Sequence, residues 1–538
     1  MTNPTPAKAG RKEWIALGVL TLTALLVSMD AMVLYFAIPF ISAKLRPGAA
    51  QQLWILDIYG FVLAGLLITM GSLGDRIGRR RLLLLGGGAF GLASLAAAYS
   101  HSADQLIASR ALLGIAGATI APSTMALLRN MFPDPKERKT AIGVWTGAFS
   151  GGAALGPVAG GLLLDHFWWG SVFLINVPVM AVLLIAGPLL LPEYRDPRPG
   201  RFDLLSALLS FGAVLPVVYG VQQWAQNGLS ADPDLSVVAG LLVGLVFVLR
   251  QTKLADPMID LGLLRHRTFS AAMLSNILAG SMMAGFGLFS TQYLQLVLGY
   301  RPLAAALWSL PAPLAVGGAV AVATALSHKM RPANVIGLGF LTMTAGFIVM
   351  TQVQVHTSVA VVLVGATVLA FGIGMIVALL ADMILGTAPA ERAGAAAALS
   401  ETGNEIGGAV GVAFLGSIGA AVYHHLMSGA APAAAQTLGG AQAVAAQLPG
   451  PTGAALLEHA RQSFVQGMHI AAVVCIVLMI AGAAGSMTLL RHVKSGAAQQ
   501  AEREEQEQAA AAEESPVHAA ASLPNPSAVS ATTGRART

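Results

Sequence analysis

The sequence predicts an all-helical protein that crosses a membrane about fourteen times. Of its 538 residues, 55% are hydrophobic and only 11% are charged, whereas a soluble domain usually carries about 25% charged residues. Apolar stretches long enough to cross a bilayer core recur along the chain. Lysine and arginine gather in alternate connections between them. A soluble fold is therefore excluded, and the net charge of +5 needs no nucleic acid to explain it.

Fourteen spans are expected from the stretches of roughly 20 apolar residues. The first eight lie near 14–41, 52–74, 80–99, 105–128, 140–164, 170–191, 203–222 and 235–250. The other six lie near 268–298, 302–326, 334–352, 358–386, 394–424 and 465–490. The first span lacks a small-residue cleavage site before it, so it is read as a mature helix rather than a signal peptide.

The 31 lysines and arginines set the orientation. With the N-terminus in the cytoplasm, twenty-six of them face the cytoplasm, and only Arg110 lies within a span. The outer side has four, which are Lys44, Arg46, Arg301 and Arg461. This asymmetry follows the positive-inside rule and requires an even number of spans. The sequence predicts a multi-pass protein of the bacterial inner membrane with both termini in the cytoplasm.

Two segments lie outside the spans. Residues 425–464, rich in Ala, Gly, Pro and Gln, are expected to form an external loop. The tail after about residue 495 has few large apolar groups and is expected to be disordered. The resulting organisation is a cytoplasmic N-terminus at 1–13, a six-helix half at 14–195, an inserted pair of helices at 196–255, a second six-helix half at 256–494 and the tail at 495–538.

The chain repeats itself weakly at an offset of about 254 residues. Trp54 begins the second span as Trp308 begins the tenth, and Arg138 precedes the fifth as Arg392 precedes the thirteenth. The basic turn at Asp75 also has a counterpart near the same offset. Parallel six-helix repeats about an axis normal to the membrane are the plan of a major-facilitator transporter. Such a fold binds its substrate between the halves, near the midplane.

One connection carries a specific motif. The run Gly71-Ser-Leu-Gly-Asp-Arg-Ile-Gly-Arg-Arg80 resembles the major-facilitator loop signature G-x-L-x-D-R-x-G-R-R/K at every fixed position. The resemblance implies a conformational latch between the halves, with Asp75 and Arg76 as gating residues. Arg138, in the basic turn before the fifth span, is predicted to act with them.

Two further motifs lie within spans. The run from Arg110 to Gly117 resembles the family's R-x-x-x-G-x-x-G pattern, which implies a proton-relay or gating role for Arg110. The alternative is an interfacial arginine whose head reaches water. Gly156-Pro157-Val-Ala-Gly160-Gly161 resembles the G-x-x-x-G-P-x-x-G-G motif of drug antiporters, which favours an exporter. The resemblance implies that Gly156 and Pro157 are gating residues in a flexible helix between the halves. The alternative is ordinary packing of small residues.

The closest likeness is to the fourteen-helix drug:H⁺ antiporters. The run from Asp30 to Pro39 resembles that family's D-x-T-V-x-x-x-A-L-P signature, with Met32 where threonine is usual. The run from Phe167 to Pro178 resembles its W-R-W-x-F-x-I-N-V-P segment. Trp54-Ile-Leu-Asp57-Ile-Tyr59 looks most like the branch that exports quaternary ammonium compounds and methyl viologen. The resemblance covers roughly residues 14–490.

Acidic residues within spans are the main candidate sites. They are Asp30, Asp57, Glu401 and Glu405, with Asp382 as a fifth nearer the cytoplasmic end of its span. Acids inside a membrane are rare and functional by default, and burial favours their protonated form. They are predicted to exchange a proton for an organic cation, the two glutamates as a coupled pair on one helical face. The alternative for each acid is a structural hydrogen bond.

Aromatic side chains near these acids are predicted to line the substrate cavity. Flat or quaternary cations bind such rings through cation–π contact and buried area, although most aromatics in membrane helices have packing roles. The candidates are Tyr35, Trp54, Tyr59, Trp145 and Phe149 in the first half, and Phe286, Phe289, Tyr293 and Trp308 in the second.

The resemblance implies proton-coupled export of lipophilic or quaternary cations by alternating access. The expected partners are cationic drugs or dyes, protons and the lipid bilayer, and a monomer is expected. No Walker A pattern is present, so the proton gradient is expected to drive transport without a cofactor. An enzyme is not expected, because neither a metal-ligand cluster nor a nucleophile–base pair is apparent. Three alternatives stay open: an exporter of an endogenous or secondary metabolite, a proton-coupled importer, and a non-transporting sensor or scaffold.

Overall fold

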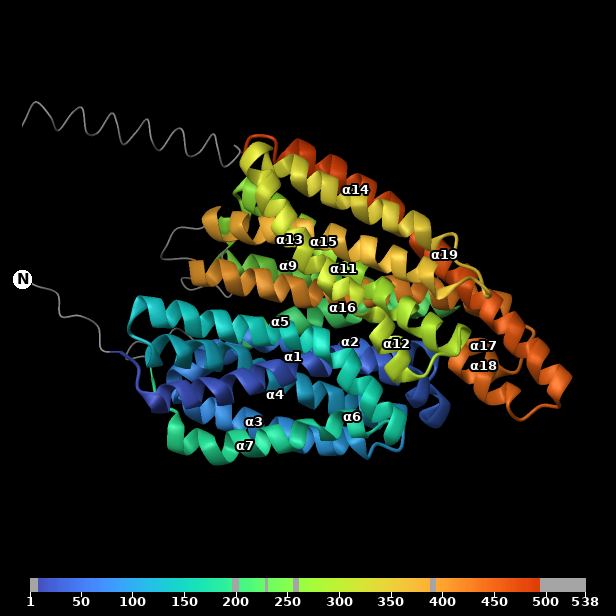
Figure 1. Ribbon diagram of the computed structural model, residues 1–538, viewed down its shortest axis with the longest axis horizontal. Coiled ribbons are helices and arrows are strands. Elements are labelled where there is room, and N and C mark those ends of the chain that lie inside the picture. The colour runs from blue at the N-terminus through green and yellow to red at the C-terminus, as the bar shows by residue number, and fades with distance from the viewer. Residues whose placement is uncertain (1–7, 196–202, 228–230, 255–260, 388–392, 494–538) are drawn as a thin grey trace, which may run out of the picture.

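The structure, a computed structural model, describes residues 8–195, 203–227, 231–254, 261–387 and 393–493 (Figure 1). Within these ranges it is all-helical, without a strand. The first half contains α1 (Arg11–Leu45), α2 (Ala49–Ile77), α3 (Arg79–Ala98), α4 (Ala103–Met131), α5 (Pro135–His166), α6 (Ser171–Leu174) and α7 (Asn176–Leu190). The inserted pair is α8 (Leu204–Asn227) and α9 (Ala231–Gln251).

The second half begins with the short α10 (Leu261–Leu264). It continues with α11 (Arg267–Gln292), a π-helical turn at Tyr293–Val297, α12 (Pro302–Ser309), α13 (Pro311–Lys329), α14 (Pro332–Met350), α15 (Val359–Thr387) and α16 (Ala393–Leu426). It ends with α17 (Pro432–Gln436), α18 (Leu438–Ala445) and α19 (Gly450–Leu489).

All fourteen predicted spans fall on helices. Within the described residues, thirteen helices are long and apolar enough to cross a membrane. The remaining span, 203–222, falls on α8, whose apolar part Leu204–Gly220 is shorter. The tenth span is divided into α12 and α13 because Pro311 provides no amide hydrogen for a continuous helix.

The segment 425–464 differs from the expected loop, because most of it is helical. It contains α17, α18 and the first turns of α19, which begins at Gly450 rather than near 465. Alanine and glutamine favour helices. Pro432 is in the first turn of α17, Pro449 precedes α19, and the Thr437 side chain accepts a hydrogen bond from the Gly440 amide at the start of α18. The predicted tail lies outside the described residues.

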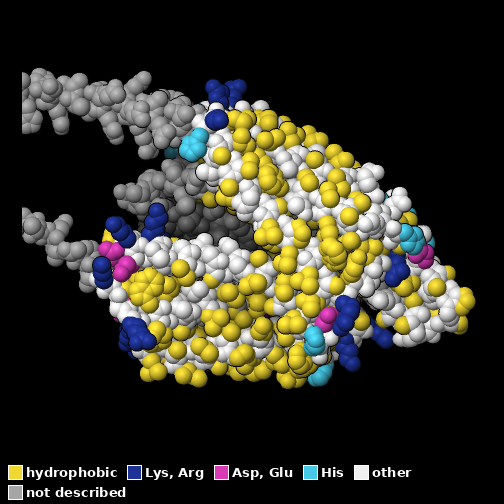
Figure 2. Space-filling model, in the orientation of Figure 1, with side chains coloured by type: hydrophobic (Ala, Val, Ile, Leu, Met, Phe, Trp, Pro, Cys, Tyr) yellow, Lys and Arg dark blue, Asp and Glu magenta, His cyan; other side chains and the backbone are white. Residues whose placement is uncertain are grey.

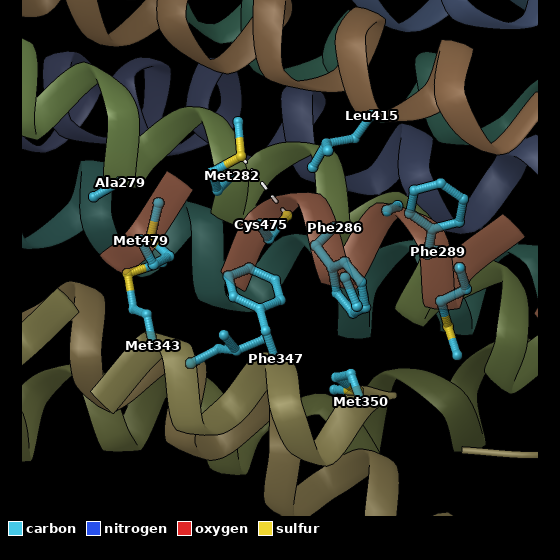
Figure 3. Packing of buried hydrophobic residues seen from close by; sticks show 14 of the residues in the cluster. Ala279, Met282, Phe286, Phe289, Met343, Phe347, Met350, Leu415, Cys475 and Met479 are labelled. Atoms are coloured by element: carbon cyan, nitrogen blue, oxygen red, sulfur yellow. Dashed lines mark hydrogen bonds between the residues drawn. The ribbon is translucent and has the colours of Figure 1, made fainter. Parts of the chain in front are cut away.

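Each half has its own core. One cluster of buried side chains runs through α1 to α7 and also includes Leu294, Ala305 and Ala306 of the second half. Another runs through α11 to α19. Figure 3 shows the second core, in which the Phe286 and Phe347 rings meet edge to face with centroids 5.2 Å apart and Met282 lies beside Cys475. Inside a bilayer, close contacts of this kind hold helices together, since lipid tails are as apolar as leucine. The two-half architecture expected from the repeat is therefore confirmed.

The inserted helices lie at one side of the junction between the halves. α8 and α9 pack closely, because a Cβ on Gly240 of α9 would lie only 2.7 Å from the Ala213 carbonyl oxygen of α8. α8 also packs against α2 of the first half and α16 of the second. The outer face of α9 exposes leucines and valines such as Leu241 and Leu245, as a lipid-facing helix does.

The halves meet at the end of the bundle that carries α12, α17 and α18, which we call the closed end. There a Cβ on Gly161 of α5 would lie 2.7 Å from the Leu303 Cα of α12, and one on Gly416 of α16 would lie 2.5 Å from Leu53 of α2. The Gln295 amide donates to the Phe36 carbonyl across the halves at 3.3 Å. At the opposite end, where α1 and α5 begin, the halves diverge around a hollow (Figure 2). We call this the open end.

Candidate functional site

A large cavity lies between the two halves. Its volume is about 890 Å³, and it is lined by α1 and α5 from the first half and by α11, α12, α13 and α15 from the second. Its polar lining side chains are the hydroxyl residues Ser28, Ser150, Ser290, Thr291, Ser309 and Thr367. No lining residue in the described part of the chain is charged. The cavity therefore suits a bulky apolar ligand held by buried area.

Three of the nine predicted aromatics line this cavity: Phe149, Phe286 and Trp308. Trp145 stacks on Phe149, with ring centroids 5.6 Å apart and planes inclined by 14°, so it supports the wall from behind. Phe36 and Met32 of α1 also line the cavity, and the aromatic prediction did not include Phe36. Phe36 was missed because nothing in the sequence showed which face of α1 would meet the cavity.

The other predicted aromatics lie elsewhere. Phe289 packs against Phe464, with centroids 6.0 Å apart, and the Tyr293 hydroxyl donates to the Gln354 carbonyl at 2.6 Å. Trp54 and Tyr35 are half-buried, and both pack on α2 residues beside the junction of the halves. Sequence proximity to an acid did not distinguish these packing roles from cavity positions, because the two faces of one helix differ only by rotation.

Asp30 does not line the cavity but forms a network inside the first half. Its Oδ2 accepts a hydrogen bond from Arg110 Nη1 at 2.7 Å, and its Oδ1 accepts one from Asn176 Nδ2 at 2.8 Å. Both members of the ion pair are buried, Asp30 being 4% and Arg110 1% exposed. Charges so far from water require close pairing of this kind. Arg110 is therefore a core residue and not an arginine that reaches the membrane surface.

Further contacts hold the Arg110 head in place. Its Nε donates to the Ile55 carbonyl of α2 at 3.3 Å, and its guanidinium lies over the Tyr59 ring at 4.4 Å from the centroid. Asn176 also donates to Ser94 at 3.1 Å. This network joins α1, α2, α3, α4 and α7, so Tyr59 serves a cation–π contact within the protein rather than a wall of the cavity.

Asp57 has a different environment. It is 2% exposed, and its Oδ2 has no hydrogen-bond partner among the described residues. Leu53, one turn before it, packs on Val412 and Gly416 of α16, and Phe61, one turn after it, packs on Ala409 and Ala413 of the same helix. Residues four apart share one face of a helix. Asp57 therefore lies on the α2 face that meets the other half.

The remaining predicted acids are in the second half. Asp382 is in α15, and Glu401 and Glu405 are in the first turns of α16. Their side chains lie outside the described part of the structure. Near them, the Asn276 side chain of α11 donates to the side chain of Asn404. The role of the three acids stays a prediction.

The sequence of this chain matches a known protein family over most of its length. A family model described as the Major Facilitator Superfamily matches residues 20–412. The chain belongs to this superfamily. It is a multi-pass membrane transporter, as its helices and its likeness to named transporters agree.

Several curated major-facilitator proteins resemble it over most of their length. The multidrug efflux pump LfrA of Mycolicibacterium smegmatis is 43% identical over 489 residues, which cover 89% of this chain and 97% of LfrA. The methyl viologen resistance protein SmvA of Salmonella typhimurium is 35% identical and is covered to 97%. The tetracenomycin C resistance and export protein of Streptomyces glaucescens is 30% identical and is covered to 92%.

Solved structures share the fold at low identity. A bacterial homologue of the human lysosomal transporter Spinster, crystallised in an inward-facing and unoccupied conformation, superposes with a TM-score of 0.65 at 18% identity, over 91% of this chain and all of that one. A POT family transporter in complex with 5-aminolevulinic acid gives a TM-score of 0.60 at 16% identity, over 88% of this chain and 96% of that one.

The major-facilitator loop signature makes its described contacts within the first half. Arg79 pairs with Asp75 at 2.5 Å, and Arg80 and Arg81 each lie 3.6 Å from Glu193, which follows α7. Gly78 has a φ of 111°, and a Cβ there would lie 2.3 Å from Glu193. In this conformation Arg80 and Arg81 connect the loop to the segment after α7, which belongs to the same half. The latch that the resemblance implies would instead connect the two halves. Glu193 was missed because only the fold brings it to the loop.

The other predicted gating residues lie near the same end. Arg138 is in the first turn of α5, where its amide donates to the Asp134 carbonyl at 2.9 Å. Asp134 caps this helix by accepting from the amides of Lys136 and Glu137, both at 2.9 Å. Arg76 is in the last turn of α2, beside the signature.

The glycine motif of α5 serves mainly to pack α5 on α1. A Cβ on Gly152 would lie 2.2 Å from the Leu25 carbonyl oxygen, and one on Gly156 would lie 3.0 Å from the Met29 carbonyl oxygen. Gly161, near the closed end, instead lies against Leu303 of the other half. Pro157 lines the cavity. The motif thus brings α1 and α5 together as one wall of the cavity.

One ion pair across the halves was not predicted. Asp165, at the end of α5, lies 3.6 Å from Arg301, just before α12. Arg301 is 74% exposed along its side chain, while Asp165 is 8% exposed. Because the arginine head is exposed to solvent and lies 3.6 Å from the carboxylate, the pair contributes little stability by itself. It marks the place beside Gly161 where the two halves meet at the closed end.

Proposed function

We propose that this major-facilitator protein exports lipophilic or quaternary cations in exchange for protons. The observation that carries the proposal is Asp57, a buried acid without a described partner on the face of α2 that meets the other half. A carboxyl group in such surroundings is far more stable protonated than ionised. When the halves move and water reaches it, it can release its proton, which couples proton movement to the change of access.

The cavity supplies the substrate site in this proposal. Phe149, Phe286 and Trp308 offer ring faces that attract a cation, and the methionines Met32 and Met283 give an adaptable surface. About 25 cal/mol of favourable transfer free energy accompanies each Å² of apolar surface removed from water. Aromatic cations with a large apolar area are therefore the favoured ligands.

The open end is assigned to the cytoplasm. Arg11, Arg79, Arg138, Lys329 and Arg491 lie at the ends of helices on this side, whereas few basic residues lie at the closed end. This distribution supports our proposal that both termini lie in the cytoplasm and that the protein resides in a bacterial inner membrane. In this orientation the described conformation is inward-facing, ready to take substrate from the cytoplasm or the inner leaflet.

The relatives support drug export, since two of them are named for multidrug efflux and for methyl viologen resistance. The proton gradient drives the cycle without a cofactor, and a monomer suffices because the cavity is built within one chain. Each charge moved across 100 mV is worth about 2.3 kcal/mol.

A second candidate function is export of an uncharged or weakly charged metabolite. The observation that favours it is the lining of the cavity, which has hydroxyl groups but no charged side chain within the described residues. The tetracenomycin C export protein among the relatives fits this reading. Transport of neutral polycyclic compounds at rates equal to those of methyl viologen would favour this candidate over a cation exporter.

Everted membrane vesicles that contain the full chain test the main proposal. An imposed ΔpH is expected to drive uptake of ethidium or methyl viologen into wild-type vesicles, and Asp57→Asn is expected to abolish it. Asp232→Asn, at an exposed acid in α9, is the control and leaves uptake unchanged. Uptake that ignores ΔpH, or that persists in Asp57→Asn, contradicts the proposed coupling.

A further inference from the structure

The inserted helix α8 makes contacts with both halves at the level of Asp57. Its Val218 belongs to one packed cluster with Phe61 of α2 and with Ala409 and Ala413 of α16. Val218 is 5% exposed and Phe61 is 3% exposed, so the cluster is closed to the outside. A side chain of the insert thus covers the junction one turn from Asp57.

A second contact fixes α8 on the first half. Phe211 lies against Gly65 of α2 so closely that a Cβ on Gly65 would lie 2.4 Å from the Phe211 ring. Phe211 and Leu215 also pack on Ile58, Val62 and Leu66. The glycine provides the recess for the ring, and the ring sets the position of α8 along α2.

The two sides of the junction therefore differ. On the side of α5 and α13 the cavity opens between the halves. A Cβ on Gly317 of α13 would meet no described atom within 4 Å there. On the side of α2 and α16, α8 covers the junction. Among the described residues, the cavity lining therefore includes none from α2, where Asp57 lies, and none from α8 or α16.

We propose that Val218 and Phe211 are positioning residues that keep the α2–α16 junction sealed beside Asp57. This inference rests on the proposed function. The seal keeps water from reaching Asp57 until the halves move, so that a proton crosses only together with substrate. It gives the inserted helices a role in coupling, although α8 contributes no described residue to the lining of the substrate cavity.

Several titratable or charged groups are on the elements packed against α2. Arg110 of α4 is already paired with Asp30 of α1, and Tyr219 of α8 is 42% exposed. Glu401 and Glu405 are on α16, with side chains outside the described part. A proton leak through Asp57 must therefore be distinguished from protons taken up or released by these other groups. A double variant that also lacks the Asp57 carboxyl makes this distinction.

Full-length protein in liposomes loaded with a pH-sensitive dye tests the proposal. An imposed ΔpH decays slowly in wild type without substrate, and ethidium accelerates the decay. Val218→Ala and Phe211→Ala are each expected to raise the substrate-free proton flux several-fold and to lower the ethidium carried per proton. Val218→Ile is expected to keep the wild-type flux, because isoleucine retains the β-branched side chain that fills this position. Leu208→Ala, 57% exposed on the same helix, is the matched control and leaves the flux unchanged.

Adding Asp57→Asn distinguishes a specific leak from a damaged fold. The excess flux of Val218→Ala disappears in the Val218→Ala/Asp57→Asn variant if the leak runs through Asp57. An excess flux that survives in this double variant, an equal leak in Leu208→Ala, or no excess flux in either α8 variant overturns the inference. Ethidium binding to Val218→Ala, measured by fluorescence, is the control for folding and is expected to equal that of wild type. If Val218→Ala loses ethidium binding and shows no proton leak, the inference is also overturned.

The same experiment separates this inference from the proposed function. If wild type shows no ethidium-dependent proton flux, the proposed coupling fails and the role of α8 fails with it. If wild type is coupled and the α8 variants behave like wild type, only the role of α8 is lost.

Discussion

At the residue scale, two acids of the first half have opposite surroundings. Asp30 has a charged partner in Arg110 at 2.7 Å, whereas Asp57 has no described partner for its Oδ2. From the sequence both are acids within a span, and both were predicted to exchange protons. The difference arises from helix packing, which brings Arg110 of α4 and Asn176 of α7 to Asp30.

Breaking the Arg110–Asp30 pair by removing one partner is predicted to destabilise the fold more than breaking an exposed pair does. Arg110→Ala leaves a buried carboxylate unpaired, and breaking such a pair costs about 3–5 kcal/mol. Thermal unfolding in detergent, followed by the fluorescence of the tryptophans, measures the effect as a lowered Tm. Arg301→Ala removes an exposed arginine 3.6 Å from its partner and should lower Tm little. Equal shifts in the two variants would refute this assignment.

Three residues of this network lay within motifs that the sequence analysis had singled out, but the network itself was not predicted. Asn176 was within the Ile-Asn-Val-Pro segment used for the family resemblance, and Arg110 was within its own motif. Their contact with Asp30 spans 146 and 80 positions of the chain. No local pattern encodes such a contact, so only the fold shows that the three side chains act together.

At the element scale, small residues decide which helices touch. Gly152 of α5 lies so close to α1 that a Cβ would meet the Leu25 carbonyl oxygen at 2.2 Å, while Gly147 on the same helix has nothing described within 4 Å. The sequence motif predicted close packing, but it could not show that the partner is α1 of the same half rather than a helix of the other half.

Gly152→Ala is predicted to force α1 and α5 apart. Overpacking at such a site costs about 1–3 kcal/mol, and the shift widens one wall of the cavity. Gly147→Ala is the matched control, because alanine gains about 1 kcal/mol of helix propensity where nothing opposes it. Tm in detergent and ethidium binding both test this. A Gly152→Ala protein that is as stable as Gly147→Ala contradicts the packing described here.

The inserted hairpin carries a polar clamp where α8 begins and α9 ends. Asp203, just before α8, is 16% exposed and lies 2.9 Å from Arg250 of α9. Burial alone raises the pKa of this carboxyl, but hydrogen bonds from the Ser206 hydroxyl and amide and the Arg250 charge outweigh it, so the pKa is lowered below its usual value. Stability from this clamp is therefore present above the ordinary pKa of aspartate and is lost as the pH falls through the lowered value.

Asp203→Asn is predicted to loosen the hairpin at neutral pH but not in acid. The loss should be about 1 kcal/mol, as for a partly exposed charged hydrogen bond. Hydrogen exchange of the first turns of α8, measured between neutral pH and pH below the carboxyl titration, checks it. A difference from wild type that stays constant across this range, or grows in acid, shows that the carboxylate charge is not the cause.

Element boundaries show what the sequence can and cannot give. The fourteen spans were predictable because a run of about 20 apolar residues has few alternatives in a membrane protein. The helices α17 and α18 were not, because the Ala- and Gln-rich segment that contains them has no apolar period and was read as a loop. Helix propensity, with prolines at the starts, was the better guide there.

At the scale of the whole molecule, the described conformation is closed at one end and open at the other. Gly161 and Gly416 allow the halves to touch at the closed end, and the halves diverge at the open end (Figure 1, Figure 2). The internal repeat predicted two halves with a cavity between them. It could not predict which end is closed, because both arrangements bury similar residues.

A cysteine in the cavity should therefore react from one side only. Ser290→Cys lines the cavity, and the native Cys475 is fully buried and should not react. A membrane-impermeant maleimide is predicted to label Ser290→Cys in everted vesicles but poorly in right-side-out vesicles. Adding Gly161→Val, which crowds Leu303, should open the closed end and raise labelling from the outside. Equal labelling from both sides of the single variant would contradict the conformation.

The central claim is that substrate binding and protonation of Asp57 are coupled in one protein. Calorimetric titration of the purified full chain with ethidium, repeated in buffers of different ionisation enthalpy, measures the protons released on binding. The account predicts proton release by wild type and by Asp232→Asn, and none by Asp57→Asn. Equal release in Asp57→Asn and wild type, or no release in wild type, would show that Asp57 is not the coupling group.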